Sequence, residues 1–177
     1  MTDAELARLI REHAYLEGDF VLRSGRRSRY YLDKYRFETR PELLRALGER
    51  LGARAKEAAP NAVRLAGPEL GGVVLAAAAS LSSGLPFLIV RKEAKAYGTE
   101  NLLEGEHGNG EEACLIEDVV TSGGAAIAAV EALRKSGLAC RHAVCVVDRE
   151  EGGADGLARA GVRLHALFRA RDVVAAV

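Results

Sequence analysis

From residue 62 onward, apolar and polar positions follow a regular strand, loop and helix rhythm. Short and nearly continuous apolar runs predict five buried strands, at 62–66, 86–90, 113–117, 143–148 and 162–168. Glycine-containing loops lead from two of these runs into alanine-rich stretches, which predict helices that end near Ser82 and Gly137. Buried strands that alternate with helices are typical of a parallel sheet covered on both faces. The pattern therefore predicts an α/β fold with an open, mainly parallel sheet flanked by helices.

The first part of the chain has a different pattern. Thr2 and Glu5 have the spacing of a helix capping box, and the apolar residues that follow at helical spacing predict a helix that Gly18 ends. Residues 20–37 contain short strand-like pieces around a turn, and Pro41 begins a second predicted helix with a leucine stripe. This change of pattern predicts a small N-terminal element in front of the sheet.

Length and composition are those of one globular domain. The chain has 177 residues, of which 49% are hydrophobic and 28% are charged. We expect an N-terminal helix and hood at residues 1–40, and an α/β core at residues 41–177. Within that core, residues 91–110 form a long, polar, glycine-punctuated stretch that predicts a movable loop.

Charge and cysteine content exclude several classes of protein. Lys plus Arg and Asp plus Glu both number 25, and a nucleic-acid binder would normally show a basic excess. The longest apolar run, 73–79, is far shorter than the ~18 residues that span a bilayer, and the charged N-terminus does not resemble a signal peptide. Three cysteines without a CxxC pair argue against a disulfide framework. We therefore expect a cytoplasmic protein that binds neither nucleic acid nor membrane.

The strongest chemical signal is the segment CLIEDVVTSGGAA at residues 114–126. A predicted buried strand ends in the adjacent acids Glu117 and Asp118, and a Thr/Ser/Gly turn then leads into a helix. Backbone N–H groups, two hydroxyls and a positive helix end suit a phosphate, and the two acids can accept hydrogen bonds from the vicinal hydroxyls of a ribose. The segment predicts a site for a phosphorylated sugar. The alternative is that Asp118 only caps a turn and the glycines only permit tight packing.

This segment resembles the phosphoribosyl pyrophosphate (PRPP) motif of type I phosphoribosyltransferases. With the segments 20–33, 67–72, 90–99 and 146–153, in order over about residues 15–153, the chain is similar to orotate phosphoribosyltransferases. The resemblance implies the fold of that family and its reaction, in which orotate and PRPP give orotidine 5′-monophosphate and pyrophosphate in pyrimidine biosynthesis. It also implies Mg²⁺ as cofactor, held mainly by PRPP and water rather than by protein ligands, and a homodimer.

The resemblance implies a role for individual residues. Lys95, Asp118 and Glu117 would be catalytic, with Lys95 on a lid loop donated by the neighbouring subunit. The residues implied to bind orotate are Tyr31, Leu32, Thr121 and Arg149. Those implied to bind PRPP are Arg23, Arg91, Lys92, Lys95, Tyr97, Glu117, Asp118, Val119, Val120, Thr121, Ser122, Gly123, Gly124 and Ala125.

Four positions depart from the common pattern of the family. Arg23 replaces a lysine, Arg29 a frequent proline, Gly71 a lysine of many members, and Tyr97 a histidine. Each segment also has a structural alternative. Arg149 could form a salt bridge with a neighbouring glutamate, residues 91–110 could be a solvated charged loop, and the hood tyrosines could be ordinary hairpin contacts.

Three other functions remain as alternatives. A phosphoribosyltransferase for a purine would have no carboxylate to offer Arg149. A PRPP-sensing regulator that does not catalyse should carry a nucleic-acid-binding surface, which a net charge of zero disfavours. A bifunctional enzyme that also decarboxylates the product would need a barrel, for which 177 residues leave no room.

Overall fold

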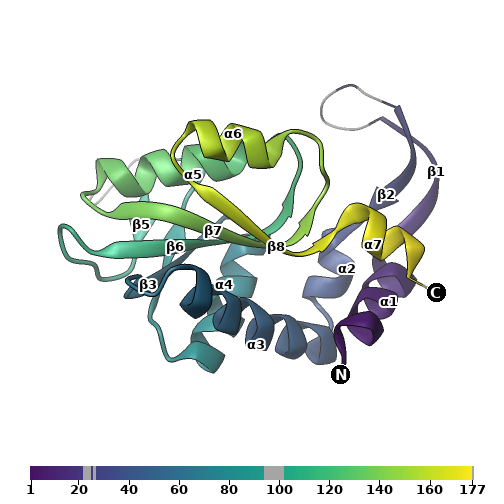
Figure 1. The fold of residues 1–177 in the computed structure, drawn as a ribbon, viewed down its shortest axis with the longest axis horizontal. Helices are drawn as coiled ribbons and strands as arrows, with labels where there is room; N and C mark the ends of the chain where they lie inside the picture. Colours follow the sequence, from purple (N-terminus) through teal and green to yellow (C-terminus); the bar gives the residue numbers. More distant parts are fainter. Residues whose placement is uncertain (22–24, 26, 94–101, 177) are drawn as a thin grey trace.

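A six-stranded sheet forms the centre of the computed structural model, which describes residues 1–21, 25, 27–93 and 102–176 (Figure 1). Its strand order is β5-β4-β3-β6-β7-β8. The strands are β3 (Arg64–Pro68), β4 (Phe87–Val90), β5 (Leu103–Glu104), β6 (Glu112–Val120), β7 (Ala139–Asp148) and β8 (Arg163–Arg169). All neighbouring pairs are parallel except β4 and β5, which are antiparallel. The expected α/β fold with a mainly parallel sheet is confirmed.

Helices cover both faces of this sheet, as Figure 1 shows. The helices α3 (Pro41–Ala58) and α4 (Gly71–Ser83) lie on one face, and α5 (Gly124–Lys135) and α6 (Gly153–Arg159) lie on the other. Alternate residues of β6 point to opposite faces, so Cys114 and Ile116 join one hydrophobic core while Ala113 and Leu115 join the second. The strands are apolar throughout because both of their faces are buried.

The first forty residues lie beside the sheet and contribute Leu6, Ile10 and Phe37 to one of its two hydrophobic cores. Helix α1 (Asp3–Ala14) leads into a two-stranded antiparallel sheet of β1 (Tyr15–Val21) and β2 (Arg27–Leu32), followed by α2 (Lys34–Glu38). The prediction that the first helix continues to Gly18 is wrong. It ends at Ala14 because Tyr15, Leu16 and Glu17 pair with β2 instead.

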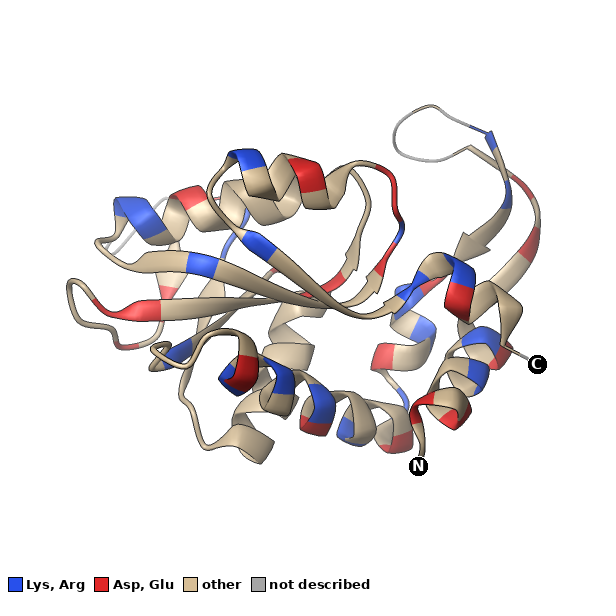
Figure 2. Cartoon of the chain, viewed as in Figure 1, with Lys and Arg blue, Asp and Glu red and all other residues tan. Residues whose placement is uncertain are grey.

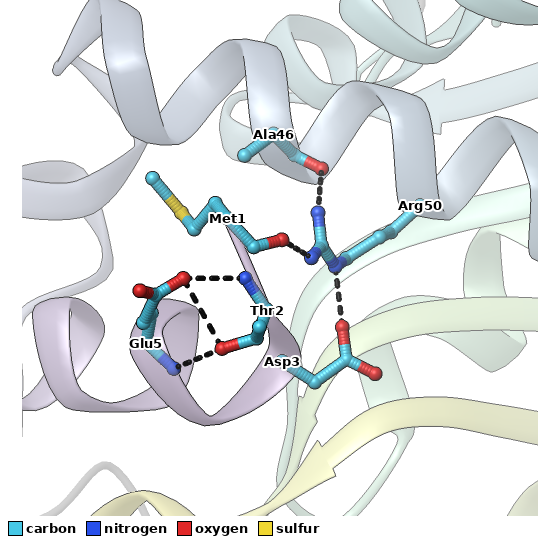
Figure 3. Close-up of polar contacts among 6 residues, drawn as sticks. All are labelled: Met1, Thr2, Asp3, Glu5, Ala46 and Arg50. Atoms are coloured by element: carbon cyan, nitrogen blue, oxygen red, sulfur yellow. Dashed lines mark hydrogen bonds and ion pairs between the residues drawn. The ribbon is translucent and has the colours of Figure 1, made fainter.

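Helix α1 contacts the rest of the chain at each of its ends through hydrogen bonds. The predicted capping box of Thr2 and Glu5 is present, and Arg50 of α3 reaches this first turn (Figure 3). Its guanidinium donates to Asp3 Oδ1 at 2.6 Å, to the Met1 carbonyl at 2.5 Å and to the Ala46 carbonyl at 3.3 Å. At the other end of the chain, α7 (Ala170–Ala175) packs against α1, where Arg11 Nε donates to the Val174 carbonyl at 3.0 Å.

Charged side chains of both signs are interspersed over the helices in the view of Figure 2, in keeping with the net charge of zero. None of the helices in the described ranges is long and apolar enough to cross a membrane.

Glycines bring α3 and α4 into close contact. A Cβ atom built at Gly48 would lie 2.7 Å from the Ala78 side chain and 2.8 Å from the Ala78 carbonyl carbon and oxygen. Because two backbones cannot move apart without opening the core, position 48 requires a residue without a side chain.

We expect Gly48→Ala to lower the free energy of unfolding by up to about 2 kcal/mol, because overpacking a core costs about 1–3 kcal/mol and the helix preference of alanine offsets about 1 kcal/mol. The measurement is urea unfolding followed by circular dichroism. Gly124→Ala is the matched control, since the nearest atom that its Cβ would meet is Ser122 Oγ at 4.0 Å. Equal unfolding midpoints for the two variants would contradict the close approach.

Candidate active site at the carboxyl ends of the strands

Two adjacent acids lie near the end of the central strand β6. The strand continues to Val120, three residues beyond the predicted end, so Glu117 and Asp118 lie within it and are only 7% and 2% exposed. Asp118 Oδ1 accepts a hydrogen bond from the Val119 N–H at 2.5 Å, and Glu117 Oε2 accepts one from the Asp118 N–H at 3.2 Å. Burial raises the pKa of Glu117 to about 8, and the charge of Asp118 adds to this effect. The two acids are thus buried and hydrogen-bonded to the backbone of the strand.

The turn after β6 leads directly into the N-terminus of α5. Gly123 has a φ of 82°, a left-handed conformation that favours glycine, and a Cβ there would lie 3.0 Å from the Gly153 carbonyl oxygen. Thr121 and Ser122 are exposed, and within the described chain no side chain caps α5. The N–H groups of the first turn therefore stay available, as an anion site at a helix N-terminus requires.

A further group of charged residues, which the sequence analysis missed, surrounds Asp118. Lys34 of α2 places Nζ 2.6 Å from Asp118 Oδ2. Glu38, four residues later, is 1% exposed, and neither of its carboxyl oxygens has a hydrogen-bond partner among the described residues. Burial, then the charge of Asp118, raises the pKa of Glu38 to about 8. The i, i+4 spacing of Lys34 and Glu38 was the available signal, but nothing in the sequence showed that α2 docks beside β6.

Gly71, at the start of α4, is in contact with the same acids. A Cβ at this position would lie 2.7 Å from both carboxyl oxygens of Glu38 and closer still to Asp118 Oδ2. The side chains of Glu38 and Asp118 thus occupy the space that a side chain at position 71 would need. This packing gives a physical reason for a glycine at position 71.

Arg149 follows β7 and connects the site to the hood. It is 9% exposed, its Nη2 lies 3.0 Å from Glu151 Oε1, and its guanidinium carbon lies 4.9 Å from the centre of the Tyr30 ring. Figure 2 shows the alternating charges of this loop. The local salt bridge that was the alternative for Arg149 is therefore present. Together with the cation–π contact to Tyr30, this salt bridge holds the guanidinium in one orientation.

The hood residues implied to bind orotate occupy different surroundings. Tyr31 is 42% exposed and lies beside Phe20, with ring centres 5.6 Å apart, whereas the side chain of Leu32 belongs to the hydrophobic core. Tyr30, which the sequence analysis did not single out, contacts Arg149 and stacks on Tyr15. Adjacent strand residues point to opposite faces, and sequence alone did not show which face of β2 meets Arg149.

The lid segment is only partly described. Arg91 Nη1 lies 3.6 Å from Glu104 Oε1 of β5, and the Lys92 N–H donates to Glu69 Oε2 at 3.1 Å, so the beginning of the segment is held against β5 and the loop after β3. The expected loop 91–110 contains β5 and is therefore not irregular throughout. The predicted residues Arg23, Lys95 and Tyr97 lie outside the described residues.

Comparisons with known proteins agree with this geometry. The phosphoribosyl transferase domain family matches residues 36–160. The orotate phosphoribosyltransferase of Methanocella arvoryzae is 45% identical over 173 residues, 97% of each chain. The structure is similar to the Mycobacterium tuberculosis orotate phosphoribosyltransferase in complex with PRPP (TM-score 0.80, 29% identity, 97% of this chain and 98% of that one).

Leishmania donovani UMP synthase has a TM-score of 0.85 and 30% identity, covering 98% of this chain but 38% of the larger protein. Relatives thus match this chain almost from end to end, and the chain contains the acid pair, the helix α5 without a side-chain cap and the buried Arg149. The resemblance inferred from the motifs is confirmed, and the chain belongs to the orotate phosphoribosyltransferase family.

Proposed function

We propose that this chain transfers the phosphoribosyl group of PRPP to orotate and releases orotidine 5′-monophosphate and pyrophosphate, a step of pyrimidine biosynthesis. One observation carries the proposal: the buried acids Glu117 and Asp118 directly precede the uncapped N-terminus of α5, and Arg149 follows the adjacent strand β7. This arrangement offers one place for a phosphate, one for ribose hydroxyls and one for a charged base.

The sugar phosphate occupies the end of β6 in this proposal. The backbone of residues 121–125 and the hydroxyls of Thr121 and Ser122 bind the 5′-phosphate, where the helix end favours negative charge. Glu117 and Asp118 accept hydrogen bonds from the ribose hydroxyls. As the C1–oxygen bond breaks, the sugar gains positive charge, which a fixed carboxylate nearby stabilises without reorganisation. Direct displacement at C1 requires no nucleophile from the protein.

The base lies between the hood and the loop after β7. Arg149 presents a planar fork that suits the carboxylate or a carbonyl pair of orotate, and Glu151 and Tyr30 hold that fork in place. We retain Tyr31, Leu32 and Thr121 as further orotate contacts, with Leu32 acting through its backbone because its side chain is buried. We retain the division into a hood at 1–40 and a core at 41–177 as part of this proposal.

The pyrophosphate end is completed across a homodimer in this proposal. Arg91, Lys92 and Lys95 bring positive charge to the leaving group, and Arg23 and Tyr97 add contacts to PRPP. A lid donated by the neighbouring subunit closes over the departing pyrophosphate. Because the lid then meets the negative charge of the leaving group, it stabilises the transition state more than the ground state. We place the enzyme in the cytoplasm, on the basis of its three free cysteines and balanced charge.

Magnesium is the cofactor in this proposal, and its ligands come chiefly from PRPP and water. Among the described residues, no three His, Cys, Asp or Glu side chains lie together as a metal site, and Asp118 Oδ2 is already paired with Lys34. An ion that retains several waters and binds phosphate oxygens suits such a site. Bound magnesium supplies positive charge to the leaving pyrophosphate.

The test of the proposed function is nucleotide formation. Mixed with orotate, PRPP and magnesium, the purified chain should produce orotidine 5′-monophosphate and pyrophosphate, measured by chromatography, and a chelator should abolish the product. Elemental analysis of the ligand-free protein should find less than one metal ion per chain. No product from orotate would refute the function, and a stoichiometric metal in the ligand-free protein would contradict the ligand assignment.

A further inference from the structure

Glu38 has no role in the function described so far, although it lies against one of the proposed catalytic acids. Glu38 is the last residue of α2, and its side chain is almost completely buried. The two carboxyl oxygens of Glu38 have no hydrogen-bond partner among the described residues. Burying an unpartnered carboxyl group costs free energy, and a hydrocarbon side chain in its place would avoid that cost. The surroundings of Glu38 show what the carboxyl group can do.

Three carboxyl oxygens converge on one point. Asp118 Oδ2 and both oxygens of Glu38 lie around the position that a Cβ atom would take at Gly71, and Lys34 Nζ lies 2.6 Å from the same Asp118 oxygen. Two acids thus share the neighbourhood of one ammonium group. The arrangement depends on α2, which carries Lys34 and Glu38 one turn apart, and on a glycine at position 71.

Few other charges act on this group. The charges with the largest influence on Glu38 are those of Asp118 and Lys34, followed by Asp33 at the start of α2, and the charge of Glu38 in turn raises the pKa of Glu117. Helix α4 has no ionisable residue from Gly71 to Ser83. Helices α1 and α3 bury apolar faces, and none of their charges is among the leading influences on Glu38.

We propose that Glu38 is a positioning residue for Asp118 and makes PRPP binding depend on its own protonation. The proposal rests on the function proposed above, in which Asp118 receives the ribose hydroxyls. When Glu38 is neutral, its carboxyl proton can be donated to Asp118 while Lys34 pairs with the same carboxylate, so both groups hold Asp118 in place and its remaining lone pairs can accept the sugar. When Glu38 is ionised, it competes for Lys34 and adds a buried negative charge that repels the polyanionic substrate.

The direction of the pH effect follows from the environment of Glu38. Burial and the charge of Asp118 raise the pKa of Glu38 from 4.5 to about 8, so the group is neutral at pH 7 and ionised at pH 9. If only the neutral form binds PRPP well, one tenth of the chains remain competent at one pH unit above the pKa, which raises KM by about tenfold. Glu117 titrates in the same range, so the contribution of Glu38 is measured as a difference between variants.

The experiment measures KM for PRPP at pH 7 and pH 9 in the unmodified chain, in Glu38→Gln and in Glu42→Gln. The rise in KM should be about tenfold smaller in Glu38→Gln, because this variant cannot ionise. Glu42→Gln is the matched control, since Glu42 is an exposed glutamate in the next helix, paired with Arg40, and should follow the unmodified chain. Equal rises in Glu38→Gln and the unmodified chain would overturn the proposal. If Glu38→Gln fails to fold, Glu38→Leu carries the same comparison.

A second measurement needs no activity. In protein labelled with ¹³C at the glutamate carboxyls, the resonance that Glu38→Gln removes should titrate near pH 8. Titration of that resonance near the ordinary pKa of glutamate would overturn the proposal even if the enzyme is active. If the resonance titrates near pH 8 but no base is converted to a nucleotide, the proposed function fails instead, and the two failures remain distinct.

Discussion

Orotate is converted to its nucleotide several powers of ten faster than uracil, the same ring without the carboxylate. This is the result that we expect from the surroundings of Arg149, which is 9% exposed and oriented by Glu151 and Tyr30. A site built to pair a buried charged group rejects a ligand that leaves the group unpaired, commonly by a factor of about 10⁴. The measurement is kcat/KM with PRPP and magnesium for orotate, uracil and hypoxanthine.

Variants connect this selectivity to one side chain. Arg149→Ala should lose most of its activity on orotate while its activity on uracil changes little, so the ratio between the two bases falls. Arg141→Ala is the matched control, because Arg141 lies near the beginning of the same strand and pairs with Glu112 away from the site. Turnover of uracil or hypoxanthine equal to that of orotate in the unmodified chain would refute the assignment of the base.

The second large effect concerns the lid across the dimer. Lys95→Ala should reduce turnover by about two to three powers of ten, the size expected when one donor to transition-state charge is removed. Arg149→Ala is also impaired, but the two residues serve different subunits in the proposed dimer. When the two variants are unfolded and refolded together, about half of the dimers are mixed and each mixed dimer has one intact site, so about a quarter of the activity returns.

The refolding experiment has an internal reference. Unmodified protein carried through the same treatment gives the yield of active dimer, and each variant refolded alone gives the residual activity. If Lys95 acts within its own subunit, every site keeps one lesion and no activity returns. An inactive mixture beside an active reference therefore excludes the shared lid.

The sequence predicted what local pattern and strand order determine. The apolar runs predicted all five parallel strands, with bounds that differ from those of the structure by up to four residues. The runs were informative because a strand buried on both faces is apolar at nearly every position. The apolar runs also drew attention to the acids, which lie near the end of β6, and to the Thr/Ser/Gly turn and Arg149, which follow β6 and β7. Short elements without a periodic pattern, α2, β5, α6 and α7, were missed.

The remaining errors concern contacts between distant segments. The first helix ends early because β1 pairs with β2, and the contact of Tyr30 with Arg149, which the sequence did not predict, depends on the face that this hairpin turns toward the sheet. Lys34 and Glu38 look like an ordinary exposed pair one helical turn apart, and only the docking of α2 beside β6 and Gly71 buries them. Such contacts join residues more than a hundred positions apart in some cases, beyond the reach of local patterns.

The packing of α1 against α7 has a consequence for synthesis on the ribosome. Helix α1 leaves the exit tunnel long before its partner α7, at residues 170–175, and the Arg11 to Val174 hydrogen bond cannot form before those residues emerge. Chains grow at about 5–20 residues per second, so the apolar face of α1 waits for several seconds after its own translation. A nascent chain that stalls before residue 170 therefore exposes the face of α1 that α7 covers to chaperones and proteases, and this contact forms only once residues 170–175 have left the ribosome.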